Sequence, residues 1–199
     1  MSTDRNAAAD FRIEAVTEAN LDAAAEVHAD SWQSSHAAIC APPVQTPRLL
    51  VRRVTVDDAQ DLFSVLSDPE VMRCIEPPFT LAQTLDFVRT AGLSQPPLVY
   101  GVVWRQSGAL IGHLIWQPWD ESAMELGWIL RRDFWGRGVA KELTAAMLAR
   151  TDRDVVLECS PEQTATRHIA ALFGAERVDA DRNGQTEVYR IKRISHKTM

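Results

Sequence analysis

The sequence contains little cysteine and no long apolar run. Its three cysteines, Cys40, Cys74 and Cys159, show neither paired nor Cys-x-x-Cys spacing, so they indicate neither a disulfide framework nor a zinc site. No apolar stretch approaches the roughly 18 residues that a membrane-spanning helix needs. Residues 1–10 lack the apolar centre of a signal peptide. We therefore expect a reduced, cytoplasmic protein that has no metal and no membrane partner.

Positive charge is also scarce. The chain carries 21 Lys and Arg against 27 Asp and Glu, which gives a formal net charge of −6. This balance argues against a broad nucleic-acid-binding surface, although a local basic patch is compatible with it. What the sequence does have is a 46% apolar content over 199 residues. That is enough for one sizeable core and an extra element, but not for two full domains.

From residue 48 onward, β-rich runs alternate with helical patterns. The predicted order is β-α-α-β-β-β-α-β-α-β-β, which is typical of a mixed α/β sheet with strand–helix–strand crossovers in its second half. Thr80 is the expected N-cap of the second helix, and Pro161 is expected near the first position of the last one. The predicted strands are 48–54, two runs joined as a hairpin within 97–116, 123–130, 154–159, 176–180 and 186–194, the last two meeting at an Asn183–Gly184 turn.

The N-terminal part is organised differently. Residues 1–10 are expected to form a flexible tail, and residues 11–45 a strand–helix segment with a linker at about 40–47. Residues 12–30 align with 50–68 at four identities in nineteen positions and share the same strand–cap–helix order. A partial internal repeat and two ordinary βα units that look alike explain this similarity equally well. We expect the segment to pack on the main domain, residues 46–193, or on a second subunit, with residues 194–199 as a tail.

A glycine-rich turn follows the strand at 123–130. Gly136 and Gly138 flank Arg137 directly before a helical pattern. A helix N-terminus offers unpaired N–H groups and partial positive charge, and glycine lets a ligand approach the backbone, so the turn suits a phosphate or pyrophosphate. An ordinary connection with turn glycines explains it equally well. Neither a P-loop ending nor a third dinucleotide-motif glycine is present, since position 141 is Lys141.

The stretch DFWGRGVAKEL resembles the acyl-CoA-binding motif of the GNAT superfamily of N-acetyltransferases. It is most similar to the RimJ/RimL-like branch, which acetylates protein N-termini and other amines. The stretches around TPRLLVRRVTVDDA, ALIGHLIW and LECSPEQTATRHIAALFGAERV are similar to other parts of that branch, in the same order, over about residues 46–193. The resemblance implies a GNAT-like α/β fold with a central mixed, mostly antiparallel sheet flanked by helices. It also implies acetyl-CoA as co-substrate.

The resemblance further implies which residues hold the cofactor. The pyrophosphate would lie on the turn, at Gly136, Arg137, Gly138, Val139 and Ala140. The end of the preceding strand would pair with the pantetheine arm like an added strand, at Ile129, Leu130 and Arg131, and one of its N–H groups would serve as oxyanion donor. Trp135 replaces the Gln or Arg found in many members, as is common in the RimJ/RimL-like branch.

Glu125 is the candidate general base, because many family members carry a catalytic glutamate at this place in the strand. Strand alternation puts it on the face opposite Leu126. An ordinary solvated or ion-paired glutamate remains the alternative, and Glu158 is the second candidate. On the thiol side, Gln163 stands at the position of a frequent Asn and Thr166 at that of a frequent Ser.

The usual tyrosine acid is missing, because its position holds Ala170, and His168 is expected to be a surface histidine. Two functions therefore stay open. The first is an acetyl-CoA-dependent N-acetyltransferase that acts on an unidentified primary amine by direct transfer in a ternary complex. The second is a catalytically degenerate acyl-CoA sensor or partner-binding module. A tRNA- or ribosome-directed modifier is disfavoured by the acidic charge, and a homodimer is an open alternative.

Overall fold

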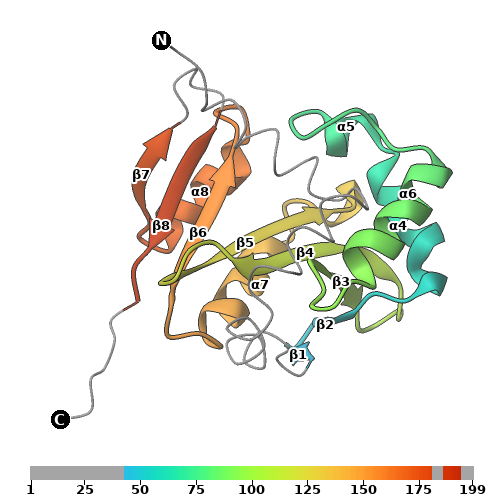
Figure 1. Ribbon diagram of the computed structural model, residues 1–199, viewed down its shortest axis with the longest axis horizontal. Coiled ribbons are helices and arrows are strands. Elements are labelled where there is room, and N and C mark those ends of the chain that lie inside the picture. Colours follow the sequence, from blue (N-terminus) through green and yellow to red (C-terminus); the bar gives the residue numbers. More distant parts are fainter. Residues whose placement is uncertain (1–42, 181–185, 194–199) are drawn as a thin grey trace, which may run out of the picture.

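One eight-stranded sheet forms the centre of the computed structural model, which describes residues 43–180 and 186–193 (Figure 1). The expected segment of residues 11–42, the Asn183–Gly184 turn and the tails at 1–10 and 194–199 lie outside the described residues. The strand order is β1-β2-β3-β4-β5-β6-β8-β7. The strands are β1 (Val44–Gln45), β2 (Leu49–Arg53), β3 (Val99–Trp104), β4 (Leu110–Pro118), β5 (Ala123–Leu130), β6 (Asp154–Cys159), β7 (Glu176–Ala180) and β8 (Glu187–Ile191).

The helices follow the predicted order, with differences at their ends. They are α4 (Ala59–Leu66) after a 3₁₀ turn at Val56–Asp58, the short α5 (Pro69–Met72), α6 (Leu81–Phe87) continuing into a π-helical turn at Val88–Gly92, α7 (Val139–Leu148) and α8 (Thr164–Leu172). The Thr80 cap is confirmed, since its hydroxyl accepts the Gln83 N–H. The predicted place of Pro161 is wrong, because residues 160–163 form a turn and α8 begins only at Thr164.

The sheet is mixed and mostly antiparallel, as expected. Its one parallel pair among the described strands joins β5 to β6 through α7. The predicted crossovers in the second half are present: α7 connects β5 to the parallel β6, and α8 connects β6 to β7, which runs in the same direction with the antiparallel β8 between them. Among the described residues, the two halves of the sheet pair with each other only through β5 and β6.

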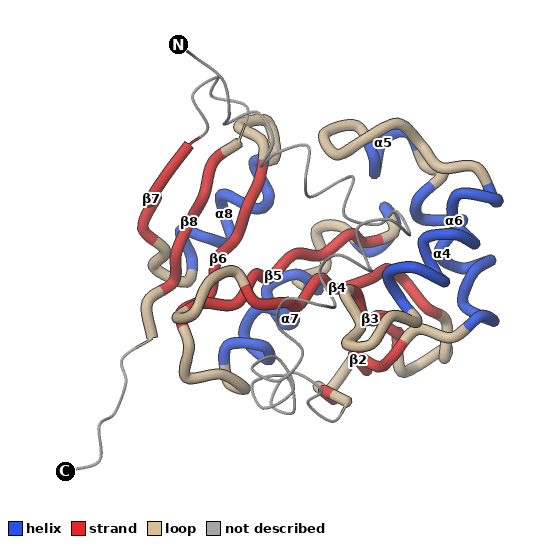
Figure 2. The backbone as a smooth tube through the Cα atoms, in the orientation of Figure 1, coloured by secondary structure: helices blue, strands red, loops and turns tan. Residues whose placement is uncertain are grey.

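Two apolar clusters lie on the two faces of the sheet. Figure 2 shows α4 beside β3 and β4, and α8 beside β6 and β8. On one face α7 packs on the strands through Val139, Leu143 and Met147, which recur at helical spacing and are all buried. On the other face α4 packs through Leu62 and Leu66. Successive residues of a strand therefore point alternately to α7 and to α4, which decides which side chains of β5 can meet a substrate.

Gly112 lies where β4 approaches β5 most closely. The pairing of β3 with β4 shifts by one residue at this point, between Val102 and Val103. A Cβ atom on Gly112 would stand 2.1 Å from the carbonyl oxygen of Ile129. Only a residue without a side chain allows the two backbones this distance, so Gly112 fixes how the end of β5 sits on the sheet.

The neighbouring His113 is buried on the α4 face. Its side chain is 2% exposed, its ring lies 5.1 Å from that of Phe87, and its Nδ1 atom has no hydrogen-bond partner. Burial lowers the pKa of His113 from 6.5 to about 4. The imidazole is therefore neutral in the folded protein at neutral pH.

We expect this histidine to make the protein acid-sensitive. Between the two pKa values the unfolded chain binds a proton at His113 and the folded chain does not, so stability falls as the pH is lowered through this range. The loss should be about 2 kcal/mol at about pH 5 relative to about pH 8. Urea unfolding of wild type and His113→Leu at both pH values checks this. The variant should lose that much less on acidification, and an equal loss in both proteins would contradict the expectation.

No helix within residues 43–180 and 186–193 is long and apolar enough to cross a membrane. Two cysteines fall within these residues, and both are free thiols: Cys74 is half-buried and Cys159 is buried. Burial raises the pKa of the Cys159 thiol to about 11. Cys159 is therefore protonated at neutral pH and is not poised as a nucleophile.

Candidate active site

The sheet opens into a fork between β5 and β6. The two strands pair at Ala123↔Asp154, Met124↔Val155 and Glu125↔Val156, and no later pair joins them among the described residues. Beyond this point β6 continues to pair with β8 as far as Cys159, whereas β5 continues along β4. The facing edges of the two strands are therefore free of each other beyond Glu125, and an extended ligand can lie between them.

Glu125 stands at the closed end of this fork. Its side chain is half-buried and points to the α4 face, as expected, whereas Leu126 belongs to the core on the α7 face. The residue opposite it on β4, Gln117, donates a hydrogen bond from Nε2 to Oε2 of Glu125 at 2.7 Å. This amide fixes the carboxylate without neutralising its charge, so Glu125 can still accept a proton.

The open end of β5 is fixed by two hydrogen bonds. The Arg131 N–H donates to the Ile111 carbonyl on β4 at 2.8 Å, and the Leu130 carbonyl accepts the indole N–H of Trp135 at 2.8 Å. Backbone groups alternate in direction along a strand, so Ile129 also faces β4, while Trp128 and Leu130 face the fork. The backbone N–H and C=O groups of β5 that face the fork are therefore those of Trp128 and Leu130.

The glycine turn connects β5 to α7 as predicted. Gly136 and Gly138 both adopt positive φ, 69° and 74°, and Gly138 is the N-cap residue of α7. A Cβ on Gly136 would meet nothing within 4 Å, and one on Gly138 would meet only Nη2 of Arg48, at 3.7 Å. The first turn of α7, which contains Val139 and Ala140, presents N–H groups that have no acceptor within the helix. The turn is therefore an open cradle for an anion.

An aromatic residue anchors the segment before the turn. Phe134 is buried and packs at 5.1 Å from the Trp104 ring on β3. The guanidinium groups of Arg131 and Arg137 lie 5.1 Å and 5.2 Å from the centre of the Phe134 ring, with which they can make cation–π contacts. Arg131 also forms a bidentate pair with Asp133 and so lowers the pKa of that carboxyl. The cationic side chains beside the turn are thus held over one buried ring.

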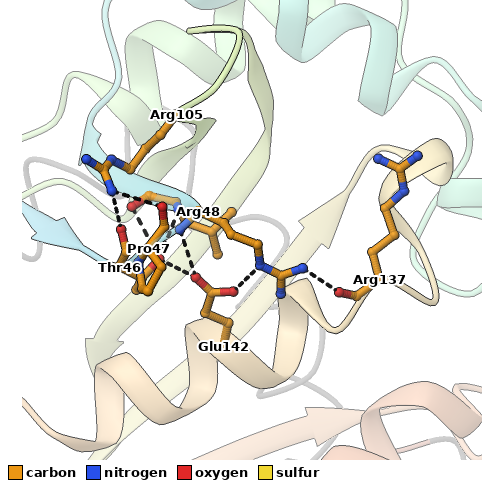
Figure 3. A network of polar contacts seen from close by, with 7 residues as sticks. Thr46, Pro47, Arg48, Arg105, Arg137 and Glu142 are labelled. Atoms are coloured by element: carbon orange, nitrogen blue, oxygen red, sulfur yellow. Dashed lines mark hydrogen bonds and ion pairs between the residues drawn. The ribbon is translucent and has the colours of Figure 1, made fainter.

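A polar network binds the start of β2 to the turn (Figure 3). The Glu142 carboxylate, in the first turn of α7, accepts hydrogen bonds from the Thr46 hydroxyl, the Arg48 N–H and Nε of Arg48, the last at 2.6 Å. Arg48 also donates from Nη1 to the Arg137 carbonyl at 2.8 Å. Arg105 donates to the carbonyls of Thr46 and Pro47. No local pattern indicates this network, because its partners lie between 58 and 96 residues apart along the chain.

The residues expected on the thiol side lie at the start of α8. Oε1 of Gln163 accepts the Ser160 N–H at 2.7 Å, within its own turn. Thr166 is half-buried one turn further on, and His168 is exposed, as expected for a surface histidine. Ala170 is 0% exposed and lies in the core on the α7 face. No proton donor can therefore come from that position.

The segment around α5 reaches across to both sides of the fork. Asp68 forms an ion pair at 3.5 Å with Arg132, which follows the end of β5 along the chain. Sγ of Cys74 lies 3.7 Å from the carboxylate of Glu162, which precedes α8. Glu76 is half-buried in the loop that follows α5, and burial raises the pKa of its carboxyl. Arg73 pairs with Glu70 on the same helix. The charged side chains of this segment are therefore mixed in sign, and Asp68 and Glu70 each take part in an ion pair.

Comparison with known proteins decides the family. Residues 48–176 match the family described as Acetyltransferase (GNAT) domain. The chain belongs to the GNAT acetyltransferase family. This GNAT chain is also 26% identical over 141 residues to an uncharacterized N-acetyltransferase, YnaD, of Bacillus subtilis, a match that covers 67% of this chain and 82% of YnaD. Family and relative together support its assignment as an N-acetyltransferase.

Solved structures share the fold. A GNAT-family acetyltransferase from Bacillus anthracis superposes with a TM-score of 0.66 at 22% identity, covering 76% of this chain and 98% of that one. RimL, a ribosomal L7/L12 alpha-N-protein acetyltransferase solved in complex with coenzyme A, gives a TM-score of 0.64 at 15% identity and covers 76% and 98%. The predicted fold class is thereby confirmed, and at this identity the likeness concerns the fold alone.

Proposed function

We propose that this GNAT chain transfers the acetyl group of acetyl-CoA to a primary amine, by direct transfer in a ternary complex. One observation carries the proposal: β5 leads from a half-buried carboxylate at the closed end of a sheet fork to an anion cradle at its open end. The five residue steps from Glu125 to Leu130 span roughly 17 Å. A ligand that reaches both ends must be long, with phosphate at one end and its reactive group at the other.

The cradle fits the pyrophosphate of such a cofactor. Space is open above Gly136 and Gly138, and the N–H groups of Val139 and Ala140 point out of the helix end. Arg137 adds a formal positive charge beside them. Gln163 and Thr166, at the start of α8, lie across the fork from β5, where they can contact the pantetheine arm. The fork-facing edge of Leu130 can pair with the same arm, next to Ile129 and Arg131.

The chemistry asks little of the protein beyond placement and one base. Acetyl-CoA supplies an activated thioester. Glu125 takes one proton from the acceptor ammonium, directly or through water, and leaves a neutral amine whose lone pair attacks the thioester carbon. The nitrogen–carbon bond forms and the carbon–sulfur bond breaks. The nitrogen loses its second proton, and the sulfur leaves as a thiol after taking up one proton through solvent. An N–H at the fork edge of β5 can donate to the carbonyl oxygen as negative charge develops on it.

We further propose a place in the RimJ/RimL-like branch. Trp135 stands directly before the glycine turn, as in that branch, and donates its indole N–H to the Leu130 carbonyl. The fold likeness to RimL supports this placement. The acceptor would then be a protein N-terminus or another primary amine.

A sensor without catalysis is the second candidate. It is favoured by Ala170, which is fully buried where a proton donor would be expected, and by Gln163, whose amide oxygen is already bonded within its own turn. Both observations concern the leaving thiol and not cofactor binding. The two candidates therefore differ in turnover and agree in affinity for CoA.

Calorimetric titration with CoA and a thiol-release assay with acetyl-CoA and a panel of amines separate the two. We expect CoA binding, and thiol release that depends on at least one amine. Gly138→Ala should weaken CoA binding about tenfold or more, because a side chain at φ 74° strains the turn whose N–H groups would hold the pyrophosphate. Gly108→Ala is the matched control, since Gly108 has nearly the same φ, 73°, in the β3–β4 turn. Binding without turnover would favour the sensor, and no binding would refute both candidates.

A further inference from the structure

The orientation of one peptide decides how well the turn can hold an anion. In a trans peptide the carbonyl of Arg137 and the N–H of Gly138 point in opposite directions. The Arg137 carbonyl accepts Nη1 of Arg48, which lies behind the turn. The Gly138 N–H is therefore directed away from Arg48, toward the open side of the cradle. Gly136 and Gly138, which flank Arg137, allow the backbone more φ and ψ angles than other residues do. The hydrogen bond from Arg48 therefore selects one of several backbone conformations of the turn.

Arg48 is itself held from two further sides. Its Nε donates to Oε2 of Glu142 at 2.6 Å, and its guanidinium lies 5.6 Å from the centre of the Trp104 ring. Arg105 fixes the backbone just before it, through the carbonyls of Thr46 and Pro47 (Figure 3). Contacts with Glu142, Trp104 and Arg105 therefore hold the Arg48 guanidinium and its backbone beside the turn, although Arg48 is distant from the turn along the chain.

Arg48 also offsets a charge that would oppose anion binding. Glu142 lies in the first turn of α7, close to the cradle, where a free carboxylate would repel a phosphate. Burial alone would raise the pKa of Glu142, but hydrogen bonds from Thr46 and Arg48 outweigh it and lower the pKa. The carboxylate is therefore ionised and engaged by these two side chains.

We infer that Arg48 is a positioning residue for the cofactor: it holds the Arg137 carbonyl so that the Gly138 N–H faces the pyrophosphate. The inference rests on the proposed function, because CoA is the ligand concerned. Arg48 touches the turn from behind and makes no contact with the reacting atoms. Its loss should therefore raise the Kd for CoA and the KM for acetyl-CoA, and leave kcat at saturation and the KM for the amine nearly unchanged.

The test uses the full chain and CoA as the probe. In Arg48→Gln the Kd for CoA should rise about tenfold or more, since a charge-assisted hydrogen bond is lost and Glu142 is left unneutralised. Arg52→Gln is the matched control. Arg52 lies four residues further along the chain, on β2, and forms a bidentate pair with Asp58 at 2.7 Å, away from the glycine turn. It should lower the unfolding temperature and leave the Kd for CoA unchanged.

The double variant Arg48→Gln/Glu142→Gln separates positioning from charge. If Arg48 acts by holding the Arg137 carbonyl, the double variant still binds CoA more weakly than the wild type, although removal of the Glu142 charge restores part of the affinity. A double variant that binds CoA like the wild type would overturn the inference, because neutralisation of Glu142 would then be the whole role. Unaltered CoA binding in Arg48→Gln would also overturn it. Failure of the wild type to bind CoA would refute the proposed function instead.

Discussion

The Gly112→Ala variant is expected to lose about 4 kcal/mol or more of its free energy of unfolding. The added Cβ would stand 2.1 Å from the Ile129 carbonyl oxygen and 2.9 Å from Cα of Leu130. Both are backbone atoms within a ladder of seven residue pairs, so neither can move aside without breaking hydrogen bonds. Urea unfolding followed by circular dichroism measures the loss.

Gly108→Ala again provides the control, because that glycine lies in the turn of the β3–β4 hairpin with nothing within 4 Å of a new Cβ. It should cost only about 1–2 kcal/mol, the strain of a positive φ. A Gly112→Ala protein as stable as Gly108→Ala would mean that β4 and β5 can separate at this point. The end of β5, and with it the open side of the fork, would then be less rigid than the structure indicates.

The Glu125→Gln variant is expected to lower kcat at least about 100-fold, while the Kd for CoA stays unchanged. Glutamine has the shape of glutamate and can still bond to Gln117, but it accepts no proton from an amine. If proton acceptance limits the rate, part of the activity should return at high pH, where the amine is already neutral. Thiol release followed over a range of pH measures both effects.

Glu176→Gln serves as the neutral control, since Glu176 is exposed on β7 and pairs only with Lys192 at the sheet edge among the described contacts. Glu158→Gln is the competing test, because Glu158 is the second candidate base and lies on β6. Full activity in Glu125→Gln together with loss in Glu158→Gln would move the base to β6. Retained activity in both would show that neither Glu125 nor Glu158 is needed.

Local patterns were enough to predict most of the fold. The residues 123–130 and 154–159 form β5 and β6 with the predicted bounds, and Thr80 caps its helix, because burial and capping depend on near neighbours. The end of α8 nearest to Pro161 was misplaced, since a proline also fits the turn that precedes a helix. The place of β8 between β6 and β7 depends on long-range pairing, which no local pattern encodes.

The backbone elements of the candidate site could be predicted from the sequence, but the side chains that hold them in place could not. Glycine spacing pointed to the turn at Gly136–Gly138, and strand alternation gave the face of Glu125. No sequence pattern indicates the roles of Gln117 and Arg48, because each acts through a hydrogen bond that forms only when separate segments of the chain pack together. Side chains that touch a ligand leave a motif in the sequence, whereas those that hold the motif in place are spread along the chain.

The fork has a mechanical consequence as well. Strands β1 to β5 form one block and β6 to β8 another, and among the described residues only three pairs join them, against seven between β4 and β5. The backbone crosses this seam through α7, whose first residues form the cradle. If the two blocks are pulled apart, they should separate at β5–β6. This short pairing also borders the proposed cofactor site, so a bound molecule would hold the two blocks together.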